Sequence, residues 1–452
     1  MGPNDLVRSL SVELPEDIAR FKAAGRFEEA VSLIDARLET DIPEMLRRRL
    51  TVEKERLRRL PAQYPFDREE VMAALNELLP GFTDEDLKRY EACGLADWIF
   101  LEGRKKYFVR AHRSLQRCHA PGGRENPYLD KMISALKKDG SLTYRITLEA
   151  GIAPNNDRFV PGRYRAWLPV PIVYGHQSGV EILNGSPDIV NPPDAPGRSA
   201  FWDRRLDTAE PFRIRYRYLS AIRYVSPLEE GSFAGVPYPG TPAPGPEDLE
   251  EDGLHIRFTP YLRSLAREIT EGCGTDLEKA WAIYCFITQK VKYTFMRQYF
   301  LIDRIGEYAA VNRRGDCGLQ AILFINLCRI CGIPARWQSG MSIGADGPGD
   351  HDWAQFYVEP WGWLFADPSF GGSAWRAGAS ERHAFYFGNI DPMRMAANRV
   401  FMASLDPPNE LLRIDPYDMQ EGEIERVGAS RPLMSREIDT YKILIDAEPV
   451  RS

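Results

Sequence analysis

The chain has 452 residues, of which 44% are hydrophobic and 27% charged, and its formal net charge is −7. This length is typical of about three domains, and the composition is that of a globular protein, which excludes wholesale disorder. The negative net charge argues against nucleic acid as a partner.

The first residues, MGPNDLVRSL, contain no apolar run of the kind found in signal peptides, and the chain has no stretch of about 18 apolar residues. The seven cysteines are odd in number and scattered, which does not suit a disulfide framework. We therefore expect a cytoplasmic protein that has no membrane partner.

Residues 1–136 are predicted to form an α-helical domain. Apolar residues recur at helical spacing between Ile18 and Leu38, and Gly25 marks a break between two helices. A further helix is expected at Arg68–Leu79, where apolar residues again recur at helical spacing.

The domain continues with a helix at Thr83–Cys93, for which Thr83 is the expected N-cap. The segment WIFLEGRKKYF then predicts a hairpin that turns at Glu102-Gly103. Helices followed by a hairpin also permit a winged-helix fold, which would not imply DNA binding in the absence of a strong basic face.

An antiparallel β-sandwich is predicted at residues 137–230. Apolar and polar residues alternate from Leu142 to Leu148 and again from Phe212 to Tyr218, which is the period of strands with one buried face. Residues 231–254 are rich in proline, glycine and acids and are expected to be a linker. Residues 255–452 are predicted to form the catalytic domain with a C-terminal β-rich extension.

The segment NRRGDCGLQAILFINLCRICGIPARWQSG predicts a buried helix that begins at Cys317. Gly315 permits a tight turn, Asp316 can cap the helix, and Gly332 can end it. At a helix N-terminus the free N–H groups and the helix dipole favour a thiolate and can bind an oxyanion. Cys317 is therefore the candidate nucleophile, and it requires a histidine to protonate the leaving group.

Only His351 and His383 follow this cysteine. His351 opens the segment HDWAQFYVEPWGWLFADPSFGG, which predicts two strands around a Glu359-Pro360 turn, the second ending at Asp367. An aspartate there can accept a hydrogen bond from the imidazole and stabilise its cation. His383, which lies among charged residues, is expected at the surface.

The geometry of this hairpin is constrained by the chemistry. A three-residue loop at 358–360 pairs Tyr357 with Trp361 and puts His351 opposite Asp367 on one face. A two-residue loop would send the two side chains to opposite faces. The catalytic hypothesis therefore predicts a loop of odd length or a bulge with the same effect.

From about residue 275 to 372 the chain resembles the transglutaminase-like core, a branch of the papain-like cysteine enzymes. The matching motifs, in order, are Arg313-Arg314-Gly315-Asp316-Cys317, Gly332–Arg336, His351-Asp352-Trp353, Gly362-Trp363 and Asp367-Pro368. The resemblance implies that Cys317 is the nucleophile, His351 the general base and acid, and Asp367 the residue that orients the histidine. The sandwich and the 387–418 region resemble larger bacterial members of the group more loosely.

Two features of the chain are not explained by the resemblance. Many relatives have an aromatic residue directly after the cysteine, whereas this chain has Gly318. No motif identifies the side chain that completes the oxyanion hole; Tyr293 is a candidate, although it also suits a core tyrosine.

Cys328 and Cys331 form a C-x-x-C inside the apolar helix, which favours core packing over a redox or zinc site.

The predicted fold is therefore α+β: a papain-like, transglutaminase-like catalytic core preceded by an antiparallel β-sandwich and an α-helical N-terminal domain. The predicted function is cysteine-dependent acyl transfer on peptide or carboxamide bonds through a thioester on Cys317, with hydrolysis favoured over transfer to an amine. The partner is then a protein or peptide substrate, and no cofactor or metal is expected. The alternative is a catalytically idle protein that keeps this fold and binds peptides or proteins.

Overall fold

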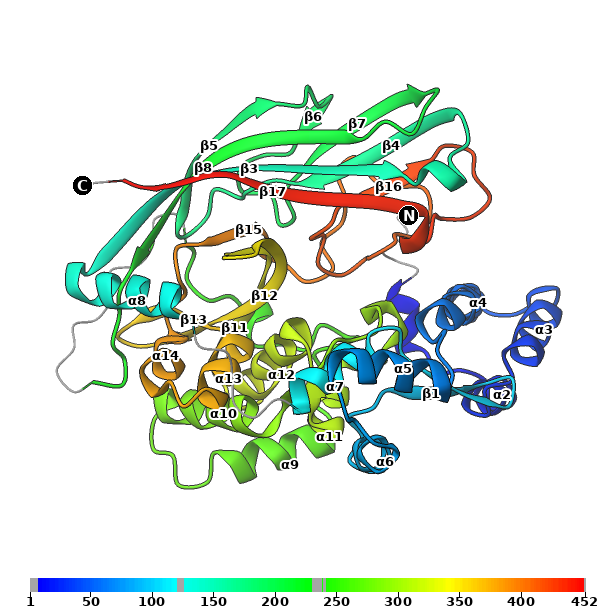
Figure 1. The fold of residues 1–452 in the computed structure, drawn as a ribbon, viewed down its shortest axis with the longest axis horizontal. Coiled ribbons are helices and arrows are strands. Elements are labelled where there is room, and N and C mark those ends of the chain that lie inside the picture. Colours follow the sequence, from blue (N-terminus) through cyan, green and yellow to red (C-terminus); the bar gives the residue numbers. More distant parts are fainter. Residues whose placement is uncertain (1–6, 120–125, 230–237, 239–240, 451–452) are drawn as a thin grey trace.

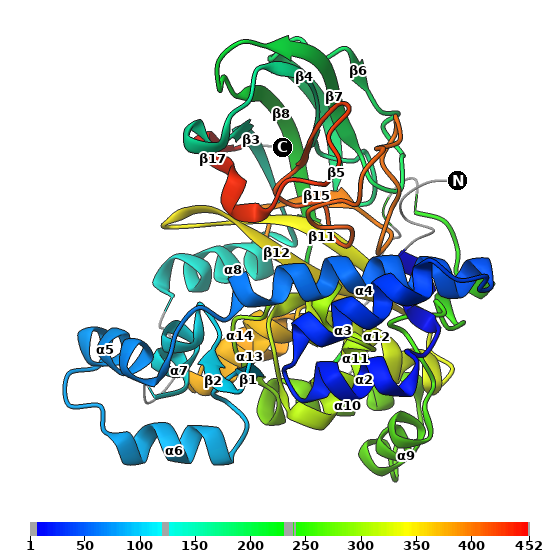
Figure 2. The ribbon, with the colours of Figure 1, turned by 90° about the vertical axis from the view of Figure 1, so that its right-hand side faces the viewer.

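The computed structural model describes residues 7–119, 126–229, 238 and 241–450. A β-sandwich forms the upper layer in Figure 1, a second sheet lies beneath it, and a layer of helices covers the lower face of that sheet. Most of the N-terminal helices lie beside this helical layer, where Figure 2 shows them in front of the core. Within the described residues, no helix is both long and apolar enough to cross a membrane.

The N-terminal region is helical, as predicted, and contains one hairpin. Its main elements are α2 (Glu16–Ala23), α3 (Phe27–Leu38), α4 (Glu44–Gln63), α5 (Arg68–Leu78), α6 (Asp84–Ala92), β1 (Trp98–Leu101), β2 (Arg104–Tyr107), α7 (Ala111–His119) and α8 (Pro127–Asp139). Thr83 caps α6 in a capping box with Asp86, which confirms that helix start.

Gly25 separates α2 from α3 and also contacts the backbone of the β1–β2 hairpin. It has a φ of +71°, and a Cβ atom there would lie 2.2 Å from the carbonyl oxygen of Phe100. The Glu102 N–H donates to the Gly25 carbonyl at 2.8 Å. Only glycine allows both this conformation and this approach of the hairpin backbone.

The sandwich consists of two four-stranded antiparallel sheets, ordered β16-β4-β7-β6 and β17-β3-β8-β5. Its strands are β3 (Ser141–Pro154), β4 (Gly162–Pro169), β5 (Gln177–Asn184), β6 (Ile189–Val190), β7 (Ser199–Leu206), β8 (Phe212–Arg223), β16 (Glu423–Arg426) and β17 (Ile438–Pro449). The last two come from the segment expected to extend the catalytic domain, but they pair with β4 and β3 of the sandwich instead. The chain thus returns to the sandwich after the core, because β3 and β4 each leave one edge for a further strand.

The core combines a five-stranded antiparallel sheet, ordered β14-β13-β12-β11-β15, with helices on its lower face in Figure 1. The strands are β11 (Ala335–Gly344), β12 (Gly347–Val358), β13 (Gly362–Ala366), β14 (Phe387–Gly388) and β15 (Arg394–Asn398). The helices are α9 (Pro260–Ile269), α10 (Asp276–Lys290), α11 (Ile305–Asn312), α12 (Cys317–Ile330), α13 (Pro368–Arg376) and α14 (Ser380–Phe385). The α12 side chains from Cys317 to Cys328 are all buried, which confirms the predicted central helix.

The β12–β13 hairpin has an odd loop, as predicted, but in a different register. Val358 pairs with Gly362 and Tyr357 with Trp363, so the loop is 359–361 rather than 358–360. Every pair is shifted by two residues from the expected register, which keeps the faces unchanged because side chains alternate with a period of two. His351 is therefore on the same face as Asp367, without being directly opposite it.

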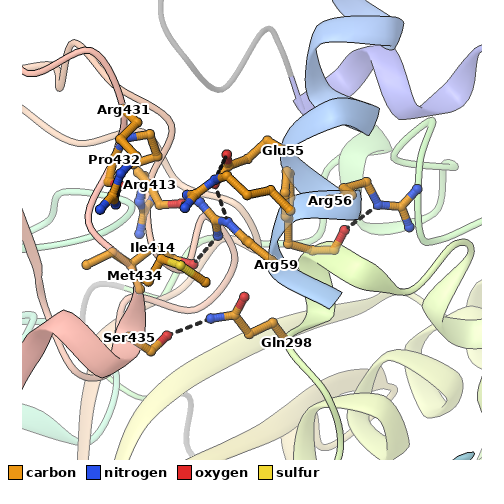
Figure 3. A network of polar contacts seen from close by, with 12 residues as sticks. Glu55, Arg56, Arg59, Gln298, Arg413, Ile414, Arg431, Pro432, Met434 and Ser435 are labelled. Carbon is orange, nitrogen blue, oxygen red and sulfur yellow. Dashed lines mark hydrogen bonds and ion pairs between the residues drawn. The ribbon is translucent and has the colours of Figure 1, made fainter. Parts of the chain in front are cut away.

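Polar contacts from α4 and from Gln298 of the core hold the C-terminal segment in place (Figure 3). Arg59 donates to the carbonyl oxygens of Ile414 and Arg413 at 2.8 and 3.0 Å, and Gln298 donates to Ser435 Oγ at 2.6 Å. Segments from the N-terminal region, the core and the C-terminal region thus meet at one place, next to the N-terminus of α12.

Candidate active site

Cys317 opens α12 and lies at the wall of a cavity. Asp316 is the N-cap and accepts a hydrogen bond from the Leu319 N–H at 3.3 Å, as predicted. The Cys317 residue is 8% exposed. Its neighbouring N–H groups belong to the first turn of the helix, where they have no partner within the helix.

The cavity has a volume of about 430 Å³ and is lined from all three parts of the chain. The N-terminal region contributes Arg110, the core contributes Tyr293 and Cys317, and the C-terminal segment contributes residues 418–422. Acidic side chains dominate its charged lining: Asp316, Asp350, Asp352, Asp415, Asp418 and Glu421. Tyr293, the candidate for the oxyanion hole, thus lines the same cavity as the thiol.

The position of Tyr299 requires a glycine directly after the nucleophile. It lies in a single-turn 3-10 helix, Tyr299–Leu301, and its hydroxyl donates to Asp316 Oδ1 at 2.7 Å. A Cβ atom at Gly318 would lie 2.1 Å from this hydroxyl oxygen. The space next to the cysteine is therefore filled by a tyrosine from elsewhere in the chain, and only glycine fits at position 318.

Asp352 is the hydrogen-bond partner of the nucleophile in this structure. The Cys317 Sγ donates to Asp352 Oδ2 at 3.5 Å, and Gln420 Nε2 donates to Asp352 Oδ1 at 2.6 Å. Burial, together with the carboxylates of Asp352 and Asp316, raises the pKa of the Cys317 thiol well above its usual value. This direction is opposite to the one expected from the helix N-terminus alone, because the thiol is buried and lies next to the acidic residues Asp352 and Asp316.

This environment leads to a prediction about thiol reactivity. At neutral pH, iodoacetamide should label the exposed Cys93 before Cys317. Asp352→Asn should accelerate labelling of Cys317 several-fold, because it removes the carboxyl group that accepts the hydrogen bond of the thiol. Peptide mapping by mass spectrometry measures both rates, and Cys93 in the same sample is the internal control. Equal labelling of Cys317 with and without the Asp352→Asn change would contradict the role given to this carboxylate.

His351 and Asp367 form a buried pair. His351 Nε2 lies 2.7 Å from Asp367 Oδ2, and the two side chains are 6% and 0% exposed. Burial by itself would raise the pKa of the Asp367 carboxyl, but His351 and Arg394 hold it below its usual range. Asp367 also accepts from the Phe370 N–H at 2.9 Å as the N-cap of α13. An ionised, fixed carboxylate is what an orienting residue needs.

The structure joins two of the three predicted catalytic residues, His351 and Asp367, by a hydrogen bond, whereas the Cys317 thiol bonds to a different residue. Cys317 bonds to Asp352, which is adjacent to His351 and points to the other face of β12. The Asp367 carboxylate nevertheless contributes to raising the pKa of the Cys317 thiol, so the thiol and the pair share one electrostatic environment.

His383 was expected at the surface, and this expectation is wrong. The residue is 4% exposed, and its Nε2 lies 2.9 Å from Thr288 Oγ1 on α10. The helix that carries it, α14, folds back onto α10, where Trp281 contacts the imidazole with ring centroids 5.5 Å apart. Local charge in the sequence does not show such a tertiary contact.

Asp316 is predicted to make stability depend on pH. Burial raises its pKa to about 6, above the unfolded value of about 3.9, so its contribution to stability falls as the pH rises between these values. Asp316→Asn keeps an N-cap and removes this cost. The variant should be more stable by roughly 2 kcal/mol at pH 8 and by much less near pH 4. Urea denaturation at both pH values checks this, and a gain that is independent of pH would contradict it.

The fold and the residue order together define an α+β protein in which a cysteine-bearing helix packs on an antiparallel sheet that carries a histidine–aspartate pair. Residues 263–368 match the family model described as the transglutaminase-like superfamily, so this chain contains a transglutaminase-like domain. No curated protein matches the chain in sequence.

Three solved structures align with parts of the chain at low identity. A candidate cysteine protease from Cytophaga hutchinsonii aligns with a TM-score of 0.40 and 13% identity over 69% of this chain and 90% of its own. The periplasmic domain of TgpA from Pseudomonas aeruginosa aligns with a TM-score of 0.27 and 15% identity over 55% of this chain and 95% of its own. A candidate protease from Parabacteroides distasonis aligns with a TM-score of 0.22 and 13% identity over 47% of this chain and 42% of its own. The assignment of the domain rests on residues 263–368.

Among the residues that the structure describes, no group of three or more histidine, cysteine, aspartate or glutamate side chains is arranged to hold a metal ion. Sequence reasoning missed Tyr299, Asp352, Gln420 and Arg394. Asp352 alone carried a signal, since it lies inside the His-x-Trp motif.

Proposed function

We propose that the protein is a cysteine-dependent enzyme that cleaves peptide or carboxamide bonds through a thioester on Cys317. The observation that carries the proposal is the buried 2.7 Å bond between His351 and Asp367, near a cysteine at the wall of a cavity in a transglutaminase-like domain. A histidine held in this way has one ring nitrogen fixed by the carboxylate and the other free for the thiol.

The proposed reaction begins when the Cys317 side chain turns from Asp352 toward His351. The thiol proton passes to Nδ1 of His351, and the sulfur forms a bond to the carbonyl carbon of the substrate. N–H groups in the first turn of α12 stabilise the negative oxygen that results. The imidazolium then protonates the leaving amine as the carbon–nitrogen bond breaks, which leaves a thioester on Cys317.

A water molecule then attacks the thioester, and His351 takes its proton and returns it to the departing sulfur. The products are a carboxylic acid and the free thiol. We favour hydrolysis over transfer to an amine because water is always present and no feature marks an amine site. The substrate is proposed to be a protein or peptide. The cytoplasmic location stays a prediction.

A second candidate function is a binding module that is catalytically idle. The specific observation in its favour is the hydrogen bond of Cys317 to Asp352 instead of His351, together with the raised pKa of the thiol. In that case the cavity would bind a peptide and the thiol would never act as a nucleophile.

The two candidates predict different outcomes with a peptide mixture in water enriched in ¹⁸O. For the enzyme, products of the wild-type protein should carry ¹⁸O in a new carboxylate, and Cys317→Ala should form none. For the module, peptides should be retained equally by both proteins with no new product. Transfer to an amine would appear as a product without ¹⁸O whose mass includes the amine.

A further inference from the structure

Behind His351 lies a buried cluster of charged groups that extends beyond Asp367. Arg394 Nη1 donates to Asp367 Oδ2 at 2.9 Å, which is the same oxygen that bonds to His351. Arg394 Nη2 and Nε donate to Asp391 Oδ2 at 2.8 and 2.9 Å. The side chains of Asp367, Arg394 and Asp391 are at most 2% exposed.

The cluster is fixed in position from several sides. The Arg394 guanidinium lies 4.4 Å from the ring centroid of Phe370, and the same ring lies 4.5 Å from the His351 imidazole. Tyr386 donates to Asp391 Oδ2 at 3.2 Å. The Arg394 carbonyl oxygen accepts from Tyr218 of the sandwich at 2.9 Å, so β15 is held to β8 at this point.

The charges of the cluster balance in only one state of the histidine. Asp367 and Asp391 are negative and Arg394 is positive, so the cluster carries one net negative charge when the imidazole is neutral and none when it is protonated. An unbalanced charge is costly in a buried site. The cluster therefore places a counter-charge next to the positive charge that His351 takes on when it accepts the thiol proton.

The other titratable groups near the cluster do not change this balance. Tyr284 of α10, Tyr386 and Tyr218 are buried phenols whose pKa values are raised well above the usual value, so they stay neutral. Burial, with the Arg394 charge, lowers the pKa of His176 to about 3, so it is uncharged as well. Burial and neighbouring acidic groups raise the pKa of the Cys317 thiol well above its usual value, so it is uncharged too.

We infer that Arg394 and Asp391 are positioning residues for the proposed reaction: Arg394 locks the Asp367 carboxylate against His351, and Asp391 supplies the negative charge that makes the cluster neutral with a protonated imidazole. This inference rests on the proposed function. It extends the catalytic unit from three side chains to five.

The test uses Asp391→Asn as the mild variant and Arg394→Lys as the stronger one, in the full chain. The first readout is independent of turnover: the low-field proton signal of the His351–Asp367 hydrogen bond in the ¹H NMR spectrum, assigned by its loss in His351→Gln. Both variants should shift or broaden this signal. Asp203→Asn, which removes a carboxylate paired with two arginines in the sandwich, is the matched control and should leave it unchanged.

The second readout is kinetic. Asp391→Asn should lower kcat about tenfold with little change in KM, because the positive charge that His351 takes on during the reaction then lacks its counter-charge. An unchanged proton signal together with an unchanged kcat would overturn the inference. If the wild-type protein has no turnover, the proposed function fails, and the NMR signal alone decides the role of Arg394 and Asp391.

Discussion

Replacement of Cys317 by serine is expected to lower kcat by a factor on the order of 10⁴ or more, provided that the fold is kept. A serine hydroxyl in this place is a far weaker nucleophile than sulfur, and the proposed thioester has no other residue on which to form. The change is nearly isosteric at a residue that is 8% exposed, so the stability of the protein should hardly change.

The measurement is turnover of the best substrate from the peptide mixture, with the thermal transition of each protein recorded in parallel. Cys93→Ser is the matched control, because this thiol is exposed and lies outside the cavity. Retention of more than about a tenth of the activity in Cys317→Ser would be incompatible with a covalent role for this residue.

The largest effect on stability is expected at Glu53 of α4. Its side chain is 0% exposed and accepts from Arg49 and Arg56 at 2.6 and 2.9 Å, with Lys22 at 2.7 Å. Glu53→Ala leaves these cations without their central anion and should lower the free energy of unfolding by about 3–5 kcal/mol. Burial alone would raise the pKa of Glu53, but the neighbouring cations hold this pKa below its usual range. The stabilisation by Glu53 is therefore present above about pH 4.3 and is lost as the pH falls.

Urea denaturation measures this loss, and Glu44→Ala is the matched control on the same helix. Glu44 pairs with Arg48 but is 64% exposed, so its removal should cost less than about 1 kcal/mol. Similar losses for the two variants would show that the Glu53 network is not a centre of stability in the N-terminal region.

The elements of the fold were largely predictable because their signals are local. The break at Gly25, the cap at Thr83 and the apolar helix that begins at Cys317 each depend on a few neighbouring residues. The pairing of β17 with β3 was not predictable, since it joins Ile438 to Pro154 across almost the whole core. Strand patterns indicate that an edge exists, but not which distant strand occupies it.

In the candidate site, too, features with a local signal were predictable and features that depend on distant segments were not. The order of the three predicted catalytic residues could be read from the sequence, and the odd length of the β12–β13 loop followed from the requirement that His351 and Asp367 share a face; the structure brings these two residues together. The pKa of the Cys317 thiol was expected to be lowered, but it is raised, because the thiol is buried and lies next to Asp352 and Asp316. The roles of Tyr299 and Arg394 depend on side chains that come from other segments, and no short motif contains that information.

The proposed reaction requires that Cys317 carries the acyl group. Its most direct test is to quench the wild-type protein with acid during turnover of a peptide substrate, digest it, and locate the acyl group by mass spectrometry. We expect a hydroxylamine-sensitive adduct on the peptide that contains Cys317, and no adduct in Cys317→Ala. An adduct on another residue, or turnover that persists in Cys317→Ala, would contradict it.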